Sequence, residues 1–209
     1  LETFERYMEQ DSSVWELQAM TRARMTAGNP EFRERFIKVC HRILFPPSPR
    51  PDLAREIYQM RKRMLEEVSK EDAFSYDIKV GRGGIVDIEF IAQYFLLSEG
   101  GRHPLLRETH TWNVLKNLRQ ENLISSRDYT FIKRAYTFLR TLESRLRMVS
   151  NLPSHLLPRE PSKVRAIALR MGYGDTPRGR AEKKLLQNYL RVREGVREMF
   201  ERILNKKGG

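Results

Sequence analysis

The segment from Asp77 to Phe90 has the residue types of a site that binds a phosphate group. An extended stretch enters a turn that contains Gly83 and Gly84, and a helix is predicted to leave it. Glycine lets backbone amides approach a ligand closely, and the amino end of a helix favours an anion. Lys79 and Arg82 add positive charge beside the turn. The pattern predicts either a phosphate-contacting turn or a tight turn that needs glycine for its conformation alone.

Two carboxylates, Asp87 and Glu89, follow the turn inside a predicted helix that is apolar on nearly every side. An unpaired buried charge costs several kcal/mol, so each carboxylate must be paired, hydrogen-bonded or neutralised. Residues two apart on a helix point about 200° apart, so the two should not share one metal ion. We expect the helix dipole to stabilise Asp87, and an arginine to pair with Glu89, either to support a site or to lock the helices together. The candidate partners are Arg22, Arg24, Arg140 and Arg145.

The same segment differs from known catalytic signatures. Polymerase-β-type nucleotidyltransferases have a Gly-Ser pair that opens a helix and an Asp-x-Asp on a later strand. Here only two residues separate Gly84 from Asp87, and the carboxylates lie on a helix. No Gly-Lys-Ser/Thr of a Walker loop is present, and the histidines and Cys40 lack zinc-ligand spacing. We therefore predict no catalytic residue and no metal site in this sequence.

Helical periodicity dominates the chain and predicts an all-α fold, a helical bundle with one short extended segment before the glycine-rich turn. The expected helices cover residues 14–25, 31–44, 52–69, 85–98, 109–122, 126–150, 162–172 and 180–205, and the extended segment covers 71–84. Trp15 and Trp112 are expected in the core. Prolines 153, 158 and 161 predict a loop. We expect a helical domain at 1–150 and carboxyl-terminal helices at 151–209 that pack on the same bundle.

Basic residues outnumber acidic ones, 39 against 27, for a net charge of +12. Such a surface attracts nucleic acid, acidic proteins or nucleotide phosphates. Acidic residues are mixed with the basic ones along the predicted helices and no nucleic-acid-binding motif is present, which disfavours nucleic acid. No apolar run could span a membrane and no signal peptide is evident, so we expect a cytoplasmic protein. The start at Leu1 rather than methionine suggests a piece of a longer protein.

Several stretches resemble the bacterial glutamine synthetase adenylyltransferases, and more loosely the uridylyltransferases that modify the PII signal protein. The glycine segment reads K-x-G-x-G-G-I-x-D-I-E-F-I-x-Q-Y from Lys79 to Tyr94. An upstream helix reads W-E-L-Q-A-M-T-R-A-R from Trp15 to Arg24. Residues 56–61, E-I-Y-Q-M-R, and 135–143, A-Y-x-F-L-R-x-L-E, also match the family pattern. The resemblance covers most of residues 1–175.

The resemblance implies a helical domain beside a nucleotidyltransferase core, in an enzyme that transfers AMP from ATP to a tyrosine of glutamine synthetase. The family's metal-binding Asp-x-Asp and Gly-Ser turn have no counterpart in this sequence. ATP and Mg²⁺ are therefore implied for the parent enzyme, whereas this chain alone is expected to be inactive and to hold no cofactor tightly. Gln18 and the Asp87-Ile88-Glu89 run resemble the half of the enzyme that adds AMP more than the half that removes it.

The resemblance further implies that Lys79, Arg82, Gly83 and Gly84 form one wall of the nucleotide cleft. It implies glutamine synthetase and the PII protein as partners of the basic surface. The alternative is a non-catalytic helical module that binds glutamine synthetase or PII and transmits regulatory signals.

Overall fold

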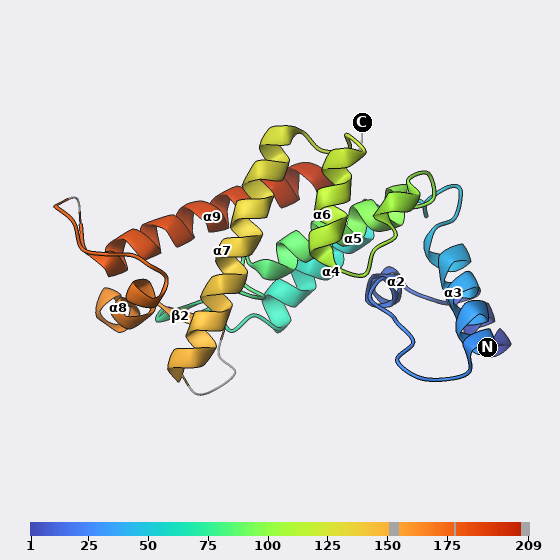
Figure 1. Ribbon diagram of the computed structural model, residues 1–209, viewed down its shortest axis with the longest axis horizontal. Coiled ribbons are helices and arrows are strands. Elements are labelled where there is room, and N and C mark those ends of the chain that lie inside the picture. Colours follow the sequence, from blue (N-terminus) through green and yellow to red (C-terminus); the bar gives the residue numbers. More distant parts are fainter. Residues whose placement is uncertain (151–154, 178, 206–209) are drawn as a thin grey trace. The chain divides into compact units, whose positions relative to one another are not determined.

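The computed structural model describes residues 1–150, 155–177 and 179–205 (Figure 1). Nine α-helices dominate these residues, together with a 3₁₀ helix and a sheet of two short strands. The helices are α1 (Glu2–Gln10), α2 (Val14–Met20), α3 (Pro30–Leu44), α4 (Leu53–Glu67), α5 (Ile85–Glu99), η1 (Pro104–Leu106), α6 (Thr111–Gln120), α7 (Ser126–Ser150), α8 (Pro161–Arg170) and α9 (Ala181–Leu204). The strands are β1 (Ser75–Asp77) and β2 (Leu156–Pro158). The predicted mainly α-helical fold is confirmed.

The chain forms two compact units, and each combines two separate stretches of sequence. Unit 1 contains residues 1–60 and 89–129, and unit 2 contains residues 61–88 and 130–209. Each unit therefore brings together residues that are far apart in the chain. The domain division expected at residue 150 stays a prediction, because a compact unit need not be a domain that folds alone.

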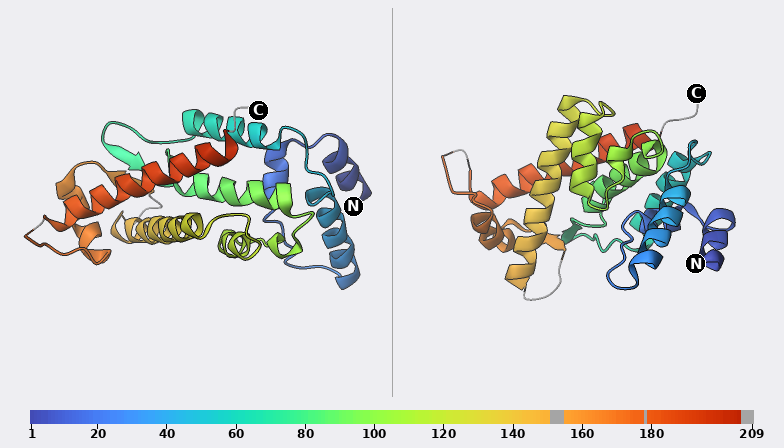
Figure 2. Two further views of the ribbon diagram at one scale, coloured as in Figure 1. Left: turned by 90° about the horizontal axis from the view of Figure 1, so that it is seen from above. Right: turned by 45° about the vertical axis from the view of Figure 1, so that its right-hand side comes forward.

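Local sequence signals fix the helix starts in unit 1. Ser13 and Glu16 form a capping box, in which the Ser13 amide donates to Glu16 Oε2 at 2.9 Å. The Asn29 side chain caps α3, and Pro30 occupies its first turn. Both α1 and α2 contact α3 (Figure 2). The helix expected to reach residue 25 ends at Met20, and α1 was not predicted.

Unit 2 contains the small sheet and the longest helices. Strand β1 pairs antiparallel with β2, with Tyr76 opposite Leu157. Only Ser75–Asp77 of the extended segment forms a strand, and its partner lies in the stretch that the prolines had predicted to be a loop. Helices α8 and α9 pack against each other (Figure 1). These elements bring residues near 80 next to residues near 190.

The core of each unit is built from the apolar faces of its helices. Buried positions in unit 1 include Leu17, Leu44, Ile91, Leu96 and Leu115, and those in unit 2 include Ile78, Ile88, Leu139, Leu142, Leu185 and Phe200. The prediction that Trp15 and Trp112 are core residues is wrong, because they are 52% and 38% exposed. Each lies on a short helix whose packed face is formed by other residues, Val14 and Leu17 in α2 and Val114, Leu115 and Leu118 in α6.

No helix in the described part of the chain is both long enough and apolar enough to cross a membrane.

Candidate functional site

Asp87 is the centre of the polar structure around the glycine turn of unit 2. Its side chain is fully buried, and its Oδ1 accepts a hydrogen bond from Arg61 Nε at 2.5 Å. Its Oδ2 accepts from the Gly83 amide at 2.7 Å and lies 3.7 Å from Arg197 Nη1. Burial raises the pKa of Asp87, and the charges of Arg61 and Arg197 oppose that shift. The carboxylate therefore holds the turn to two arginines.

Arg61 completes this structure from helix α4. Its side chain is fully buried, and its Nη2 donates to the carbonyls of Val80 at 2.7 Å and Gly81 at 2.9 Å. Burial lowers the pKa of Arg61, although Asp87 pulls it in the opposite direction. One guanidinium thus binds both the backbone of the turn and the carboxylate that follows it.

The backbone amides of the turn are used internally. The amides of Lys79 and Val80 donate to Asp77 Oδ1 at 3.0 and 2.8 Å, and the Gly81 amide donates to the Asp77 carbonyl at 3.0 Å. The Gly84 amide donates to the Gly81 carbonyl at 3.0 Å. Each of these donors is already paired, so they do not fit an incoming phosphate group.

The glycines are required by close packing. Gly83 has a φ of +66°, and a Cβ at this position would lie 1.9 Å from the carbonyl oxygen of Arg193 on α9. A Cβ on Gly84 would lie 2.7 Å from the carbonyl oxygen of Lys79. The geometry thus supports the second interpretation of the glycines, in which they serve backbone conformation and contact with α9.

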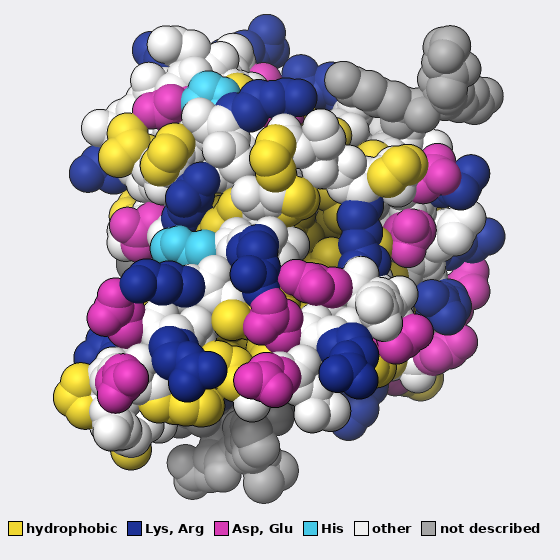
Figure 3. Space-filling view, turned by 90° about the vertical axis from the view of Figure 1, so that its right-hand side faces the viewer, with side chains coloured by type: hydrophobic (Ala, Val, Ile, Leu, Met, Phe, Trp, Pro, Cys, Tyr) yellow, Lys and Arg dark blue, Asp and Glu magenta, His cyan; other side chains and the backbone are white. Residues whose placement is uncertain are grey.

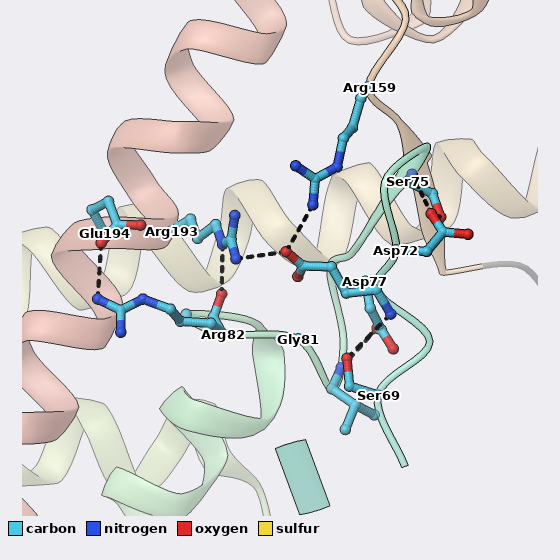
Figure 4. A network of polar contacts seen from close by, with 12 residues as sticks. Ser69, Asp72, Ser75, Asp77, Gly81, Arg82, Arg159, Arg193 and Glu194 are labelled. Carbon is cyan, nitrogen blue, oxygen red and sulfur yellow. Dashed lines mark hydrogen bonds and ion pairs between the residues drawn. The ribbon is translucent and has the colours of Figure 1, made fainter. Parts of the chain in front are cut away.

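The cationic side chains of the turn are more accessible than its backbone. Lys79 is half-buried, and the Arg82 side chain is 46% exposed. Arg82 Nη2 forms an ion pair with Glu194 Oε2 at 3.1 Å, and the backbone carbonyl of Arg82 accepts from Arg193 Nε at 3.0 Å (Figure 4). The side chains of Lys79 and Arg82 are therefore better placed to meet an anion than the paired amides of the turn.

A second network fixes the strand that precedes the turn. Glu71 Oε1 accepts from Arg193 Nη2 at 2.7 Å and from Arg159 Nη2 at 3.2 Å. The guanidinium carbons of both arginines lie over the Tyr76 ring, at 5.2 and 4.1 Å from its centre. Helix α9 and the residue after β2 thus hold the same short segment.

Glu89 has separate partners in unit 1. Its Oε1 forms an ion pair with Arg22 Nη2 at 3.1 Å, and Arg22 is one of the four arginines that the sequence suggested. One turn along α5, Gln93 Oε1 accepts from Gln18 Nε2 at 2.9 Å. These two contacts join the W-E-L-Q-A-M-T-R-A-R helix to the D-I-E-F-I-x-Q segment, so the two motifs meet in space.

The other arginines suggested for Glu89 lie elsewhere. Arg140 pairs with Glu143 at 3.0 Å, and Arg24 is exposed at the edge of a cavity in unit 1. The sequence interpretation did not identify Arg61 and Arg197 as partners of Asp87. The E-I-Y-Q-M-R motif, which ends at Arg61, was a usable signal, because an arginine in a family pattern on an otherwise packed helix needs an acidic partner. No comparable pattern marks Arg197.

A metal site would need several carboxylate, histidine or cysteine ligands close together. In residues 1–150, 155–177 and 179–205, no group of three or more His, Cys, Asp and Glu side chains is placed to hold a metal ion. The carboxylate of Asp87 is already saturated by arginines and an amide, and Glu89 is paired with Arg22. Neither carboxylate fits Mg²⁺ in this arrangement.

Comparison with known proteins gives the family. The sequence model of the GlnD PII-uridylyltransferase family matches residues 58–204. The chain belongs to this family. It is also similar to proteins named bifunctional glutamine synthetase adenylyltransferase/adenylyl-removing enzyme. The one from Bartonella henselae is 33% identical over 82% of this chain, and that from Bradyrhizobium diazoefficiens is 33% identical over 94%. The one from Pseudomonas aeruginosa is 35% identical over 70%.

The chain spans only 18%, 19% and 16% of the lengths of these three relatives. The matched region includes the glycine turn, Asp87 and both arginines that contact it.

Proposed function

We propose that this chain is the helical part of a glutamine synthetase adenylyltransferase, in the half of that enzyme which adds AMP. The observation that supports the proposal is its similarity to the bifunctional enzymes over 82% and 94% of its residues. The parent would transfer AMP from ATP to a tyrosine of glutamine synthetase and so regulate nitrogen assimilation in the cytoplasm. Glutamine synthetase and the PII protein would be the partners.

The proposed role of the chain is to form one wall of the nucleotide cleft. The paired amides around Gly83 and Gly84 leave the side chains of Lys79 and Arg82 as the groups that would contact the phosphates. Arg22 and Arg24 are further candidates for a phosphate or carboxylate contact. In the parent, Mg²⁺ would neutralise charge on the α-phosphate. The chain contains no Asp-x-Asp, so we assign its residues no catalytic step.

Titration of ATP and Mg²⁺ into the chain, followed by calorimetry, tests this role. Arg82→Ala and Lys79→Ala are each expected to weaken binding about tenfold, the equivalent of one charged contact. Glu194→Ala should strengthen binding, because it removes the carboxylate that now pairs with Arg82 at 3.1 Å. Lys70→Ala, an exposed lysine outside the turn, is the matched control and should change nothing.

The second candidate function is a non-catalytic helical module that binds glutamine synthetase or PII. The internal hydrogen bonds of the turn favour this second function. Asp87 and Arg61 hold the turn in one conformation, so the turn serves the fold. Absence of saturable ATP binding, or ATP binding that none of the three variants changes, would contradict the cleft-wall role. That result, combined with direct binding of the chain to glutamine synthetase or PII, would establish the module instead.

A further inference from the structure

Unit 1 contains a cavity that shares only Arg24 with the residues named for the proposed function. It has a volume of about 230 Å³ and lies between the end of α2, the face of α3 and residues 107–109. Much of its wall is apolar and includes Met20, Phe36, Leu44 and Phe45. An engineered apolar cavity of about 150 Å³ accepts benzene, so this cavity has room for a body of one or two rings.

The charged residues around the cavity are mostly positive. Arg24, Arg33 and Arg107 line it, against one carboxylate, that of Glu108. Within the described part of the chain, Arg24 and Arg33 have no carboxylate partner. Glu108 already accepts a hydrogen bond from Asn113 at 3.1 Å. The opening of the cavity thus carries an excess of cationic groups with free donors.

Arg107 is held in position for a ligand. Its Nε donates to the Gly100 carbonyl at 2.8 Å, and its guanidinium lies over the Phe45 ring at 5.3 Å. A guanidinium fixed in this way loses little freedom when it binds an anion. Burial and the charge of Arg107 lower the pKa of His41, another residue of the wall, and so favour its neutral form.

Figure 3 shows a face of the molecule on which hydrophobic side chains lie in a hollow bordered by Lys, Arg, Asp and Glu side chains. Ligand sites in proteins combine an apolar wall with a few polar groups that fix orientation. Among the Lys, Arg, Asp and Glu side chains that line this cavity, three of four are arginines, which bind carboxylate, sulfonate and phosphate groups through paired donors.

We propose that this cavity binds a small aromatic anion, with its ring body against Phe36 and Phe45 and its acidic group on Arg33 and Arg107. The ligand class is an aryl carboxylate, sulfonate or phosphate of one or two rings. The site is separate from the glycine turn, and it requires neither ATP nor AMP transfer.

The test uses two fluorescent probes built on the same two-ring system, naphthalene-2-sulfonate and the uncharged 2-naphthol. The sulfonate should bind the full 209-residue chain at one saturable site, at least about tenfold more tightly than the uncharged probe, and should lose affinity as salt is added. Cys40 is the single cysteine and lines the cavity, so its alkylation by N-ethylmaleimide should slow when the probe is bound.

Arg33→Glu should weaken sulfonate binding about tenfold or more, since it reverses a charge at the opening. Arg35→Glu makes the same change two residues along α3 at an exposed residue that is not part of the cavity wall, and it should leave binding unchanged. Ala23→Phe places a ring in the cavity and should block the probe, with circular dichroism to confirm that the chain is folded.

Three results would overturn the proposal: equal binding of the charged and uncharged probes, an equal effect of Arg33→Glu and Arg35→Glu, or an unchanged alkylation rate at Cys40. Because Arg33 is exposed, its variant should fold and decide the question even if Ala23→Phe does not fold.

Discussion

Asp87 joins three parts of unit 2 through a single carboxylate. It meets α4 through Arg61, the glycine turn through the Gly83 amide and α9 through Arg197. Two guanidinium groups face this carboxylate in a buried position. Its charge compensates that of Arg61, whereas Arg197 also pairs with Glu201 on α9. Removal of that charge would leave the buried Arg61 with only the carbonyls of Val80 and Gly81 as hydrogen-bond acceptors.

Asp87→Asn is expected to lower the free energy of unfolding by about 3–5 kcal/mol, the cost of one partner lost from a buried ion pair. Glu89→Gln is the matched control on the same helix. Its ion pair with Arg22 is partly exposed, so the loss should be about 1 kcal/mol or less. Urea denaturation of both variants measures the difference, and similar losses would mean that Asp87 is not the anchor of the turn.

Residue-level prediction succeeded where a pattern restricted the choice. The apolar surroundings of Glu89 required a cation, and Arg22 was among four named candidates. For Asp87 the sequence suggested the helix dipole and an ion pair without a named partner, and the structure supplies Arg61 and Arg197, which lie 26 and 110 positions away. Pairs at such separations depend on how helices pack, which a single sequence does not specify.

At the scale of elements, the glycine turn and α9 are packed too closely for any side chain between them. Gly83→Ala combines a positive φ with a Cβ 1.9 Å from a carbonyl oxygen, so it should destabilise the protein by about 3 kcal/mol or more. Gly172→Ala is the control, because φ is +83° there and no atom lies within 4 Å. It should cost only about 1–2 kcal/mol. Thermal unfolding distinguishes them, and equal costs would refute the packing explanation.

The long helices were predictable because their apolar residues recur at helical spacing, as in α7 and α9. The missed elements are short. Helix α1 has nine residues and one buried residue, Met8, although Phe4, Tyr7 and Met8 recur at helical spacing. Strand β2 has three residues and ends at Pro158. Strand β2 exists because β1 pairs with it, and pairing between residues 75–77 and 156–158 is a property of the tertiary structure.

The connection between α8 and α9 should be sensitive to acid. Asp175 Oδ2 accepts from Arg165 Nη2 at 2.8 Å, and its Oδ1 accepts from the Ala181 amide at the start of α9. These bonds lower the pKa of Asp175 from 3.8 to about 2, and the hydrogen bond from Arg165 contributes most. A lowered folded-state pKa gives stability that is present above about pH 4 and is lost as the pH falls towards 2.

Asp175→Asn should therefore reduce stability at pH 6 and have a smaller effect at pH 2.5. Unfolding in urea at the two pH values measures this difference. The same loss at both would show that Asp175 acts through its hydrogen bonds alone and not through its charge.

At the scale of the whole molecule, the 39 basic residues that give the net charge of +12 are accompanied by 27 acidic residues. Figure 3 shows Asp and Glu side chains interspersed with Lys and Arg on one face. Such mixing favours solubility and steering of acidic partners over tight binding of nucleic acid. The chemistry of AMP transfer would then depend on parts of the parent enzyme outside these residues.

The purified chain, incubated with glutamine synthetase, ATP and Mg²⁺, should transfer no AMP. The physical reason is that Asp87 is saturated by arginines and the sequence contains no Asp-x-Asp to align a metal. Mass spectrometry of glutamine synthetase detects the modification directly. A measurable mass increase by one AMP, absent when the chain is omitted, would contradict the assignment of the chemistry to the rest of the parent.

The contact between Gly83 and the backbone of Arg193 also orders events during synthesis. The turn is translated more than a hundred residues before its partner on α9. Until then Arg61 and Asp87 can associate, but the glycine turn has no α9 backbone to pack against. Closure of this region is therefore a late step of folding, and nascent chains released early would expose it to proteases.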